Sequence, residues 1–225
     1  MKYIDKTIKL ETPEVIIFDW DNTLVDAWPL IYKAMVEAFK KYDKEPWSLE
    51  ETKINVHRAL REMLPKLFPN NWQEVGDYYR KVYKKNMELL KPLPNVEKML
   101  KLLNEKDIKV ALVSNKKAYL VRKEVELLGW TKYFQSVMGS GDLDVDKPDP
   151  KTVVITLEKL SASSAKKVWF VGDSVTDMET AYASESLPVF YGPEDFNNDR
   201  FKNCFPKVHI SGYKELIAFI QSKYD

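Results

Sequence analysis

The sequence predicts an α/β fold: a Rossmann-like parallel sheet core with an inserted α-helical cap domain. Two observations predict the sheet. Short runs of β-branched and aromatic residues recur along the chain, and stretches with helical spacing separate them. Strands separated by helices favour a parallel sheet with helices on both faces. A third observation predicts the insertion, since residues 27–91 show helical periodicity without a strand pattern.

The first strong strand is Val-Ile-Ile-Phe at residues 15–18, an apolar run typical of a strand buried on both faces. It is followed by Asp19 and Asp21, and side chains two residues apart in an extended backbone point the same way. Two carboxylates at the end of a buried strand repel each other and lose hydration, which a bound cation relieves. Magnesium suits such a site because it is a hard ion that prefers oxygen ligands.

The inserted region is predicted to consist of helices. Ser48 and Glu51 form a capping box that starts the second of these helices, and prolines interrupt it later. The expected helical segments are residues 28–42, a helix from Ser48 that Leu64-Pro65 and Phe68-Pro69 interrupt, and a further helix from residue 71 toward Leu90.

Pro92-Leu93-Pro94 marks the end of the insertion. We therefore expect a core domain made of residues 1–26 and 92–225, with residues 27–91 as a helical cap domain.

After residue 94 helical and strand patterns alternate, as a parallel sheet requires. Asp149 is placed to cap the helix that Pro150 opens, and Gly129 ends the helix before it. The expected helices are residues 95–104, 118–128, from 150, 174–183 and from 214; the expected strands are 108–113, 136–139, 168–171 and the edge strands 187–191 and 208–210.

Polar residues follow the predicted strands, and ligands of open α/β sheets bind beyond the carboxyl ends of the strands. Each motif also has a structural interpretation: a solvated acidic turn, a helix cap, an ordinary loop lysine or a strand-to-helix turn. Their joint occurrence favours one functional site. The set is Asp19 and Asp21; Ser114 and Asn115; Lys147 in Lys147-Pro148-Asp149-Pro150; and Asp173 and Asp177 in Gly172-Asp173-Ser174-Val175-Thr176-Asp177.

These four motifs, in this order, resemble those of the haloacid dehalogenase superfamily, specifically its phosphoglycolate phosphatase-like phosphatases with a helical cap. The resemblance extends over nearly the whole chain. It implies Asp19 as a nucleophile that forms an aspartyl-phosphate and Asp21 as the general acid and base. It further implies that Ser114, Asn115 and Lys147 hold the phosphoryl group, and that Mg²⁺ is bound by Asp19, the backbone carbonyl of Asp21, Asp173 and, directly or through water, Asp177.

Two residues depart from the common pattern of this superfamily. Asn22 stands where glycine is usual, and asparagine is the non-glycine residue most tolerant of a left-handed backbone. Trp20 resembles the phosphonatase branch, but that branch has alanine in place of Asp21 and needs a cap lysine. The dehalogenase branch also lacks the second aspartate. Asp21 therefore favours cleavage of phosphate esters.

The cap region is expected to select the substrate by closing over the site. Residues 27–91 contain 13 Lys and Arg against 9 Asp and Glu, which suits an anionic substrate but equally a solvated helical surface. His57, Arg58 and Arg61 are candidate substrate contacts on one predicted cap helix, although a structural or exposed role is the simpler interpretation of His57.

Composition argues against several other classes of protein. The 225-residue chain has a net charge of +1, which gives no support for nucleic-acid or membrane binding. The single cysteine, Cys204, rules out an internal disulfide and is expected to be a buried or incidental thiol. The N-terminus lacks the apolar core of a signal peptide, so a cytoplasmic location is expected. No obligate protein partner is evident.

The predicted function is magnesium-dependent hydrolysis of a small phosphorylated metabolite, a phosphate monoester, through an aspartyl-phosphate on Asp19. Two alternatives stay open: a phosphomutase that returns the phosphate to a sugar, and a binding or regulatory protein without turnover.

Overall fold

The computed structural model describes residues 1, 3–5, 10–56, 60–162, 167–193 and 199–224, with the side chains of residues 3, 61 and 199 outside that description. The chain divides into two compact units, Met1–Leu24 with Pro92–Asp225 and, separately, Val25–Lys91. Among the described helices, none has both the length and the apolar composition needed to cross a bilayer.

The larger unit alternates strands with helices. Its strands are β1 (Tyr3–Ile4), β2 (Val15–Phe18), β5 (Lys109–Lys117), β6 (Ser136–Ser140), β7 (Val168–Gly172), β8 (Leu187–Tyr191) and β9 (Val208–Ile210). Its helices are α5 (Val96–Glu105), α6 (Ala118–Leu127), α7 (Lys151–Leu160), α8 (Val175–Ala183) and α9 (Tyr213–Tyr224), with the short 3₁₀ turns η2 (Thr131–Tyr133) and η4 (Asp199–Phe201).

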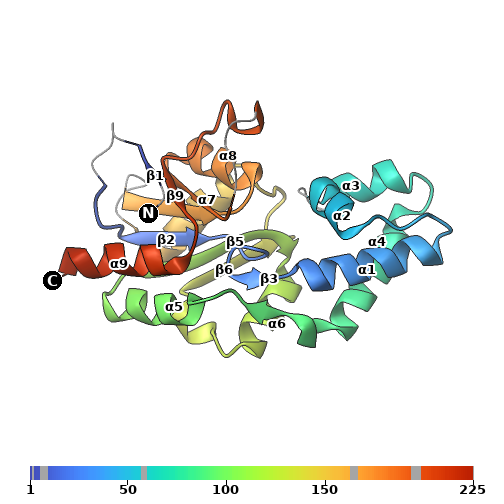
Figure 1. The fold of residues 1–225 in the computed structure, drawn as a ribbon, viewed down its shortest axis with the longest axis horizontal. Helices are drawn as coiled ribbons and strands as arrows, with labels where there is room; N and C mark the ends of the chain where they lie inside the picture. The colour runs from blue at the N-terminus through green and yellow to red at the C-terminus, as the bar shows by residue number, and fades with distance from the viewer. Residues whose placement is uncertain (2, 6–9, 57–59, 163–166, 194–198, 225) are drawn as a thin grey trace. The chain divides into compact units, whose positions relative to one another are not determined.

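Over the described residues these strands form one seven-stranded sheet in the order β1-β9-β8-β7-β2-β5-β6. Only β1 runs antiparallel to its neighbour, and the other six strands are parallel. Helices α5, α6 and α9 cover one face and α7 and α8 the other (Figure 1). From β2 the chain continues to β5 and β6 on one side and returns to β7 and β8 on the other. The carboxyl end of β2 is therefore the switch point at which such sheets bind ligands.

Strand β2 confirms the predicted buried strand, because all four of its residues are buried. Its neighbours β5 and β7 pair along its full length, with Phe18 opposite Leu112 and Val171. Beyond the strand the backbone turns at Asn22, which has a left-handed φ of 62°, as predicted for asparagine in place of glycine. This turn follows directly after the acidic residues at the carboxyl end of β2.

The smaller unit is helical. Ser48 begins its second helix with the predicted capping box, accepting from the Glu51 backbone N–H while the Glu51 carboxylate accepts from the Ser48 N–H. Phe39 packs edge-on against Trp47 and Phe68, with ring centroids 4.8 and 5.5 Å away. The elements are α1 (Trp28–Lys41), α2 (Leu49–Asn55), α3 (Leu60–Leu67), α4 (Trp72–Lys85) and the 3₁₀ turn η1 (Met87–Leu89); β3 (Val25–Asp26) pairs with β4 (Lys91–Pro92) where the chain enters and leaves.

Two expectations about the second inserted helix were wrong. The segment from Ser48 is not one helix, because α2 ends at Asn55, whose side-chain amide donates to the carbonyl oxygen of Glu51 and competes with the helical backbone. Leu64-Pro65 also does not interrupt a helix, because Pro65 lies inside α3. It removes one backbone hydrogen bond near the end of a short helix, and Leu64 beside it is buried in the unit.

Two expectations about the sheet also needed correction. Strands β8 and β9 are not edge strands, because β1 pairs with β9 and takes the edge position. Strand β5 continues to Lys117 instead of ending at Val113, and its register against β6 shifts between Ser114 and Lys117. A two-residue strand and a strand irregularity both depend on neighbours distant in sequence, so local residue patterns do not reveal them.

Candidate active site

A buried lysine joins two of the predicted acidic residues at the carboxyl end of β2. The Nζ atom of Lys147 lies 2.6 Å from Oδ1 of Asp19 and 2.6 Å from Oδ1 of Asp177. The second oxygen of Asp177 accepts from the backbone N–H and the hydroxyl of Ser174, at 3.0 and 2.6 Å, which closes a capping box at the start of α8. Asp177 therefore fixes both the ammonium group and the first turn of α8.

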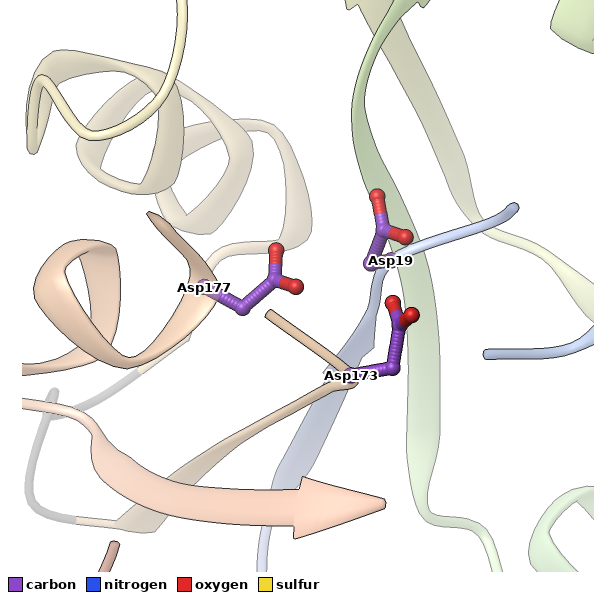
Figure 2. Close-up of side chains that lie close together, drawn as sticks. All are labelled: Asp19, Asp173 and Asp177. Atoms are coloured by element: carbon purple, nitrogen blue, oxygen red, sulfur yellow. The ribbon is translucent and has the colours of Figure 1, made fainter. Parts of the chain in front are cut away.

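The third carboxylate of this cluster belongs to Asp173, which follows β7 and is half-buried. The hydroxyl of Thr23 donates to Oδ1 of Asp173 at 3.0 Å and lies 3.5 Å from Oδ2 of Asp19. Figure 2 shows the carboxylates of Asp19 and Asp173 side by side, with Asp177 approaching from α8. One oxygen of each of the three lies within 4.8 Å of the others.

Burial and excess negative charge together set the electrostatics of this cluster. Burial raises the pKa of Asp19 to about 7; Lys147 opposes this, and Asp177 and Asp21 add to it. Burial together with Asp19 and Asp177 likewise raises the pKa of Asp173. The burial of Lys147 disfavours its charge, but the two adjacent carboxylates outweigh that effect and raise its pKa. Lys147 stays charged and compensates only part of the acidic cluster.

The donor set fits a hard divalent cation. Three carboxylates from separate elements converge, and two of them have raised pKa values. Among the described residues, the ammonium group that pairs with them is that of Lys147. Carboxylate oxygens are the ligands that magnesium prefers, and a cation would relieve the repulsion that opposes ionisation of Asp19. Both oxygens of Asp177 have close hydrogen-bond partners, whereas Oδ2 of Asp19 has only the 3.5 Å contact with the Thr23 hydroxyl, so Asp19 and Asp173 would be the better placed direct ligands.

Of the predicted pair Ser114 and Asn115 in β5, Asn115 supports the position of Lys147. The side chain of Asn115 accepts from the backbone N–H of Lys147 at 2.9 Å and donates to its carbonyl oxygen at 3.1 Å. Ser114 is buried, and its hydroxyl accepts from the backbone N–H of Lys116. That Ser114 and Asn115 hold phosphoryl oxygens stays a prediction; the contacts give Asn115 an additional role in fixing the loop that carries Lys147.

A second buried lysine, which the sequence did not single out, faces Asp21. The Nζ atom of Lys116 lies 2.6 Å from Oδ1 of Asp21 and 2.7 Å from Oε2 of Glu124 on α6. Burial disfavours the charge of Lys116, but these two carboxylates outweigh it and raise its pKa. Burial raises the pKa of Glu124, which also accepts from the indole N–H of Trp20 at 2.5 Å.

The structure thus brings together Asp19, Lys147, Asp173 and Asp177, and Asn115 holds the backbone of Lys147. His57 and Arg58 lie outside the described residues, as does the side chain of Arg61. Cys204 is buried, as predicted, and burial raises the pKa of its thiol. Sequence reasoning missed Thr23, Lys116 and Glu124. Thr23 lies in the same turn as the two aspartates, which is a usable signal, whereas a single lysine and a helical glutamate carry none.

Comparisons with known proteins agree with this geometry. Residues 16–186 match the family model described as haloacid dehalogenase-like hydrolase. The chain is 31% identical over 167 residues to a phosphoglycolate phosphatase of Aquifex aeolicus, an alignment that spans 73% of this chain and 78% of the relative. It is 26% identical over 210 residues to pyrophosphatase PpaX of Listeria monocytogenes, spanning 92% and 96%.

Among solved structures, a haloacid dehalogenase-like hydrolase from Streptococcus pneumoniae superposes with a TM-score of 0.81 at 18% identity. The superposition covers 93% of this chain and 99% of that protein. At this level of identity the likeness establishes the fold.

Proposed function

The chain belongs to the haloacid dehalogenase-like hydrolase family, and from that premise we propose that it is a magnesium-dependent phosphatase of small phosphate monoesters. One observation carries the proposal: the Asp19 carboxylate, at the switch point of the sheet, is held at 2.6 Å by the ammonium group of Lys147 and shares its site with Asp173. A carboxylate nucleophile that attacks a dianionic phosphate needs this concentration of positive charge and cation ligands.

The reaction divides into two displacements at phosphorus. In the first, a carboxylate oxygen of Asp19 attacks phosphorus, the bond to the ester oxygen breaks, and Asp21 gives its proton to the departing oxygen. In the second, water attacks the phosphorus of the aspartyl-phosphate and passes a proton to Asp21. Inorganic phosphate leaves, and the Asp19 carboxylate is restored.

The remaining groups stabilise charge on the phosphoryl oxygens. Lys147 supplies a fixed positive charge, and the Ser114 hydroxyl and Asn115 amide are the proposed hydrogen-bond donors. Mg²⁺ would be held by Asp19, Asp173 and the backbone carbonyl of Asp21, with Asp177 acting through water. When bound, it supplies the positive charge that lets one anion approach another.

The proposed substrate is a small phosphorylated metabolite, which the helical unit would select as a cap. His57, Arg58 and Arg61 are the proposed contacts from that unit. The names of the two relatives, phosphoglycolate phosphatase and pyrophosphatase, define the first compounds to test: phosphoglycolate and inorganic pyrophosphate. A hexose phosphate tests the mutase alternative.

The test is phosphate release from p-nitrophenyl phosphate with Mg²⁺ and with EDTA, together with mass spectrometry of the quenched enzyme. We expect release that requires the metal and an 80-Da adduct on Asp19, the mass of one phosphoryl group. Asp19→Asn should form no adduct. Absence of release with every divalent metal tested would favour a binding protein, and phosphate recovered on a hexose would favour a mutase.

A further inference from the structure

Beside Asp21 lies a set of buried groups that the proposed reaction does not use. Trp20 is fully buried and donates to Oε2 of Glu124 at 2.5 Å. Lys116 donates to the same oxygen at 2.7 Å and to Oδ1 of Asp21 at 2.6 Å. The contacts run without a gap from the indole through Glu124 and Lys116 to the Asp21 carboxylate. We call Trp20, Lys116 and Glu124 the acid-positioning cluster.

Burying this cluster costs free energy, because its lysine and glutamate side chains lose their hydration. The Glu124 side chain is 0% exposed and that of Lys116 is 7% exposed. The second oxygen of Glu124, Oε1, is also buried and has no hydrogen-bond partner among the described residues. Apolar side chains of similar size often stabilise a core as well as a buried ion pair does, so fold stability alone does not account for the cluster.

The local structure directs the cluster at Asp21. The register of β5 against β6 shifts between Ser114 and Lys117, and such irregularities re-aim side chains at the ends of strands. Glu124 projects from α6, whose buried face packs on the same strand. Trp20, packed edge-on against Trp130 with centroids 6.0 Å apart, fixes the position of the Glu124 carboxylate.

We propose that Lys116, held by Glu124 and Trp20, positions the Asp21 carboxylate for proton transfer to and from the leaving oxygen. This rests on the proposed function, in which Asp21 is the acid and base. The Asp21 side chain is 22% exposed, so without an anchor it would sample several rotamers. With Oδ1 held by the ammonium group, Oδ2 is the oxygen that exchanges the proton. Glu124 is therefore a positioning residue that acts through Lys116.

The test separates positioning of the acid from general damage. Transfer from p-nitrophenyl phosphate expels a weakly basic phenolate and needs little protonation, whereas transfer from phenyl phosphate expels a phenolate whose acid has a pKa near that of tyrosine, about 10. Single-turnover release of each phenol is measured for the wild type, Asp21→Asn, Glu124→Gln and, as a control, Glu126→Gln. Glu126 lies on the exposed side of the same helix.

We expect Glu124→Gln to slow release from phenyl phosphate by about 10- to 100-fold, the scale of general acid catalysis, and release from p-nitrophenyl phosphate by less than about threefold. Asp21→Asn should show the same selectivity with a larger loss, and Glu126→Gln should match the wild type. If Glu124→Gln does not fold, Trp20→Phe replaces it, with a smaller loss in the same direction.

Equal loss with both esters, or no loss with either, would overturn the positioning role. A wild type that releases neither phenol would instead overturn the proposed function. Full activity of Asp21→Asn on phenyl phosphate would show that Asp21 is not the general acid. It would overturn the positioning role of the cluster and leave the proposed phosphatase function intact.

Discussion

Two buried lysines form ion pairs with the two acidic residues that follow β2, and their surroundings differ. Lys147 joins Asp19 to Asp177 at 2.6 Å each, and Lys116 joins Asp21 to Glu124 at 2.6 and 2.7 Å. Around Lys147 a third carboxylate is present, so negative charge remains in excess. Lys116 faces Asp21 and the fully buried carboxylate of Glu124, which also accepts from the indole N–H of Trp20.

The same pairing of a buried lysine with two carboxylates therefore occurs in two environments that suit different roles. Burial, with a further contribution from Asp177, raises the pKa of Asp19 to about 7, and the carboxylates that remain in excess near Lys147 suit a site that takes up a cation and a phosphate. Next to Lys116, Trp20 and α6 surround the ion pair with Asp21. These surroundings suit a carboxylate whose orientation matters more than its ability to bind ions. Substitutions that affect one side only can test this division.

The largest effect is expected from Lys147→Ala. Two buried carboxylates lose their only ammonium partner among the described residues, and the phosphoryl group loses a fixed charge, so kcat/KM with p-nitrophenyl phosphate should fall at least about 1000-fold. The control is Lys151→Ala, an exposed lysine paired with Asp144, which should change activity less than about twofold. Retention of a tenth of the activity by Lys147→Ala would contradict the assignment.

A smaller loss is expected from Gly172→Ala. A Cβ atom at this position would overlap the side chain of Asp177, so the first turn of α8 must move away from β7. We expect about 10- to 100-fold lower kcat/KM and about 1–3 kcal/mol lower free energy of unfolding. Gly212→Ala is the matched control, since a Cβ there meets no atom within 4 Å. Equal behaviour of the two variants would show that α8 does not need this close approach.

The link between Asp19 and Asp173 is tested by Thr23→Val, which keeps the shape of the side chain and removes its hydroxyl. Because that hydroxyl orients the Asp173 carboxylate at 3.0 Å, the Mg²⁺ concentration for half-maximal activity should rise about tenfold. Thr23→Ser should restore it. An unchanged magnesium titration would mean that Asp173 is oriented by other groups or does not bind the ion.

The smallest effect concerns stability without metal. Because the folded pKa of Asp19 is raised from 3.8 to about 7, the folded protein binds a proton that the unfolded chain has lost, and this contribution to stability falls as pH rises between these values. In EDTA, Asp19→Asn should therefore be more stable than the wild type at pH 8 and show no such gain at pH 4. A rise of about three pKa units corresponds to about 4 kcal/mol, and the loss of the carboxylate partner of Lys147 reduces the expected gain to about 1–2 kcal/mol. Urea unfolding at both pH values measures it, and an equal difference at both would refute the raised pKa.

Much of the core could be predicted from local patterns. The buried run of β2 with its two aspartates, the capping box at Ser48 and the left-handed turn at Asn22 each depend on a few neighbouring residues. The candidate site residues of the larger unit could be identified for the same reason: each follows a strand, and the carboxyl ends of parallel strands meet at one edge.

Other features depend on contacts that no local pattern encodes. The pairing of Asn115 with the backbone of Lys147 joins residues 32 positions apart, and that of Trp20 with Glu124 joins residues 104 apart. The pairing of β1 with β9, which moves the sheet edge to the N-terminal segment, is equally non-local.

Most of the strands and helices, and the carboxylates at the strand ends, could be predicted from residue patterns alone, because periodicity, caps and turns act over a few residues. Which buried charges face one another, and so which lysine pairs with Asp19 and which with Asp21, follows only from the folded chain. The physical reason is that the cost of burying a charge depends on every group packed around it, and packing brings those groups from distant parts of the chain.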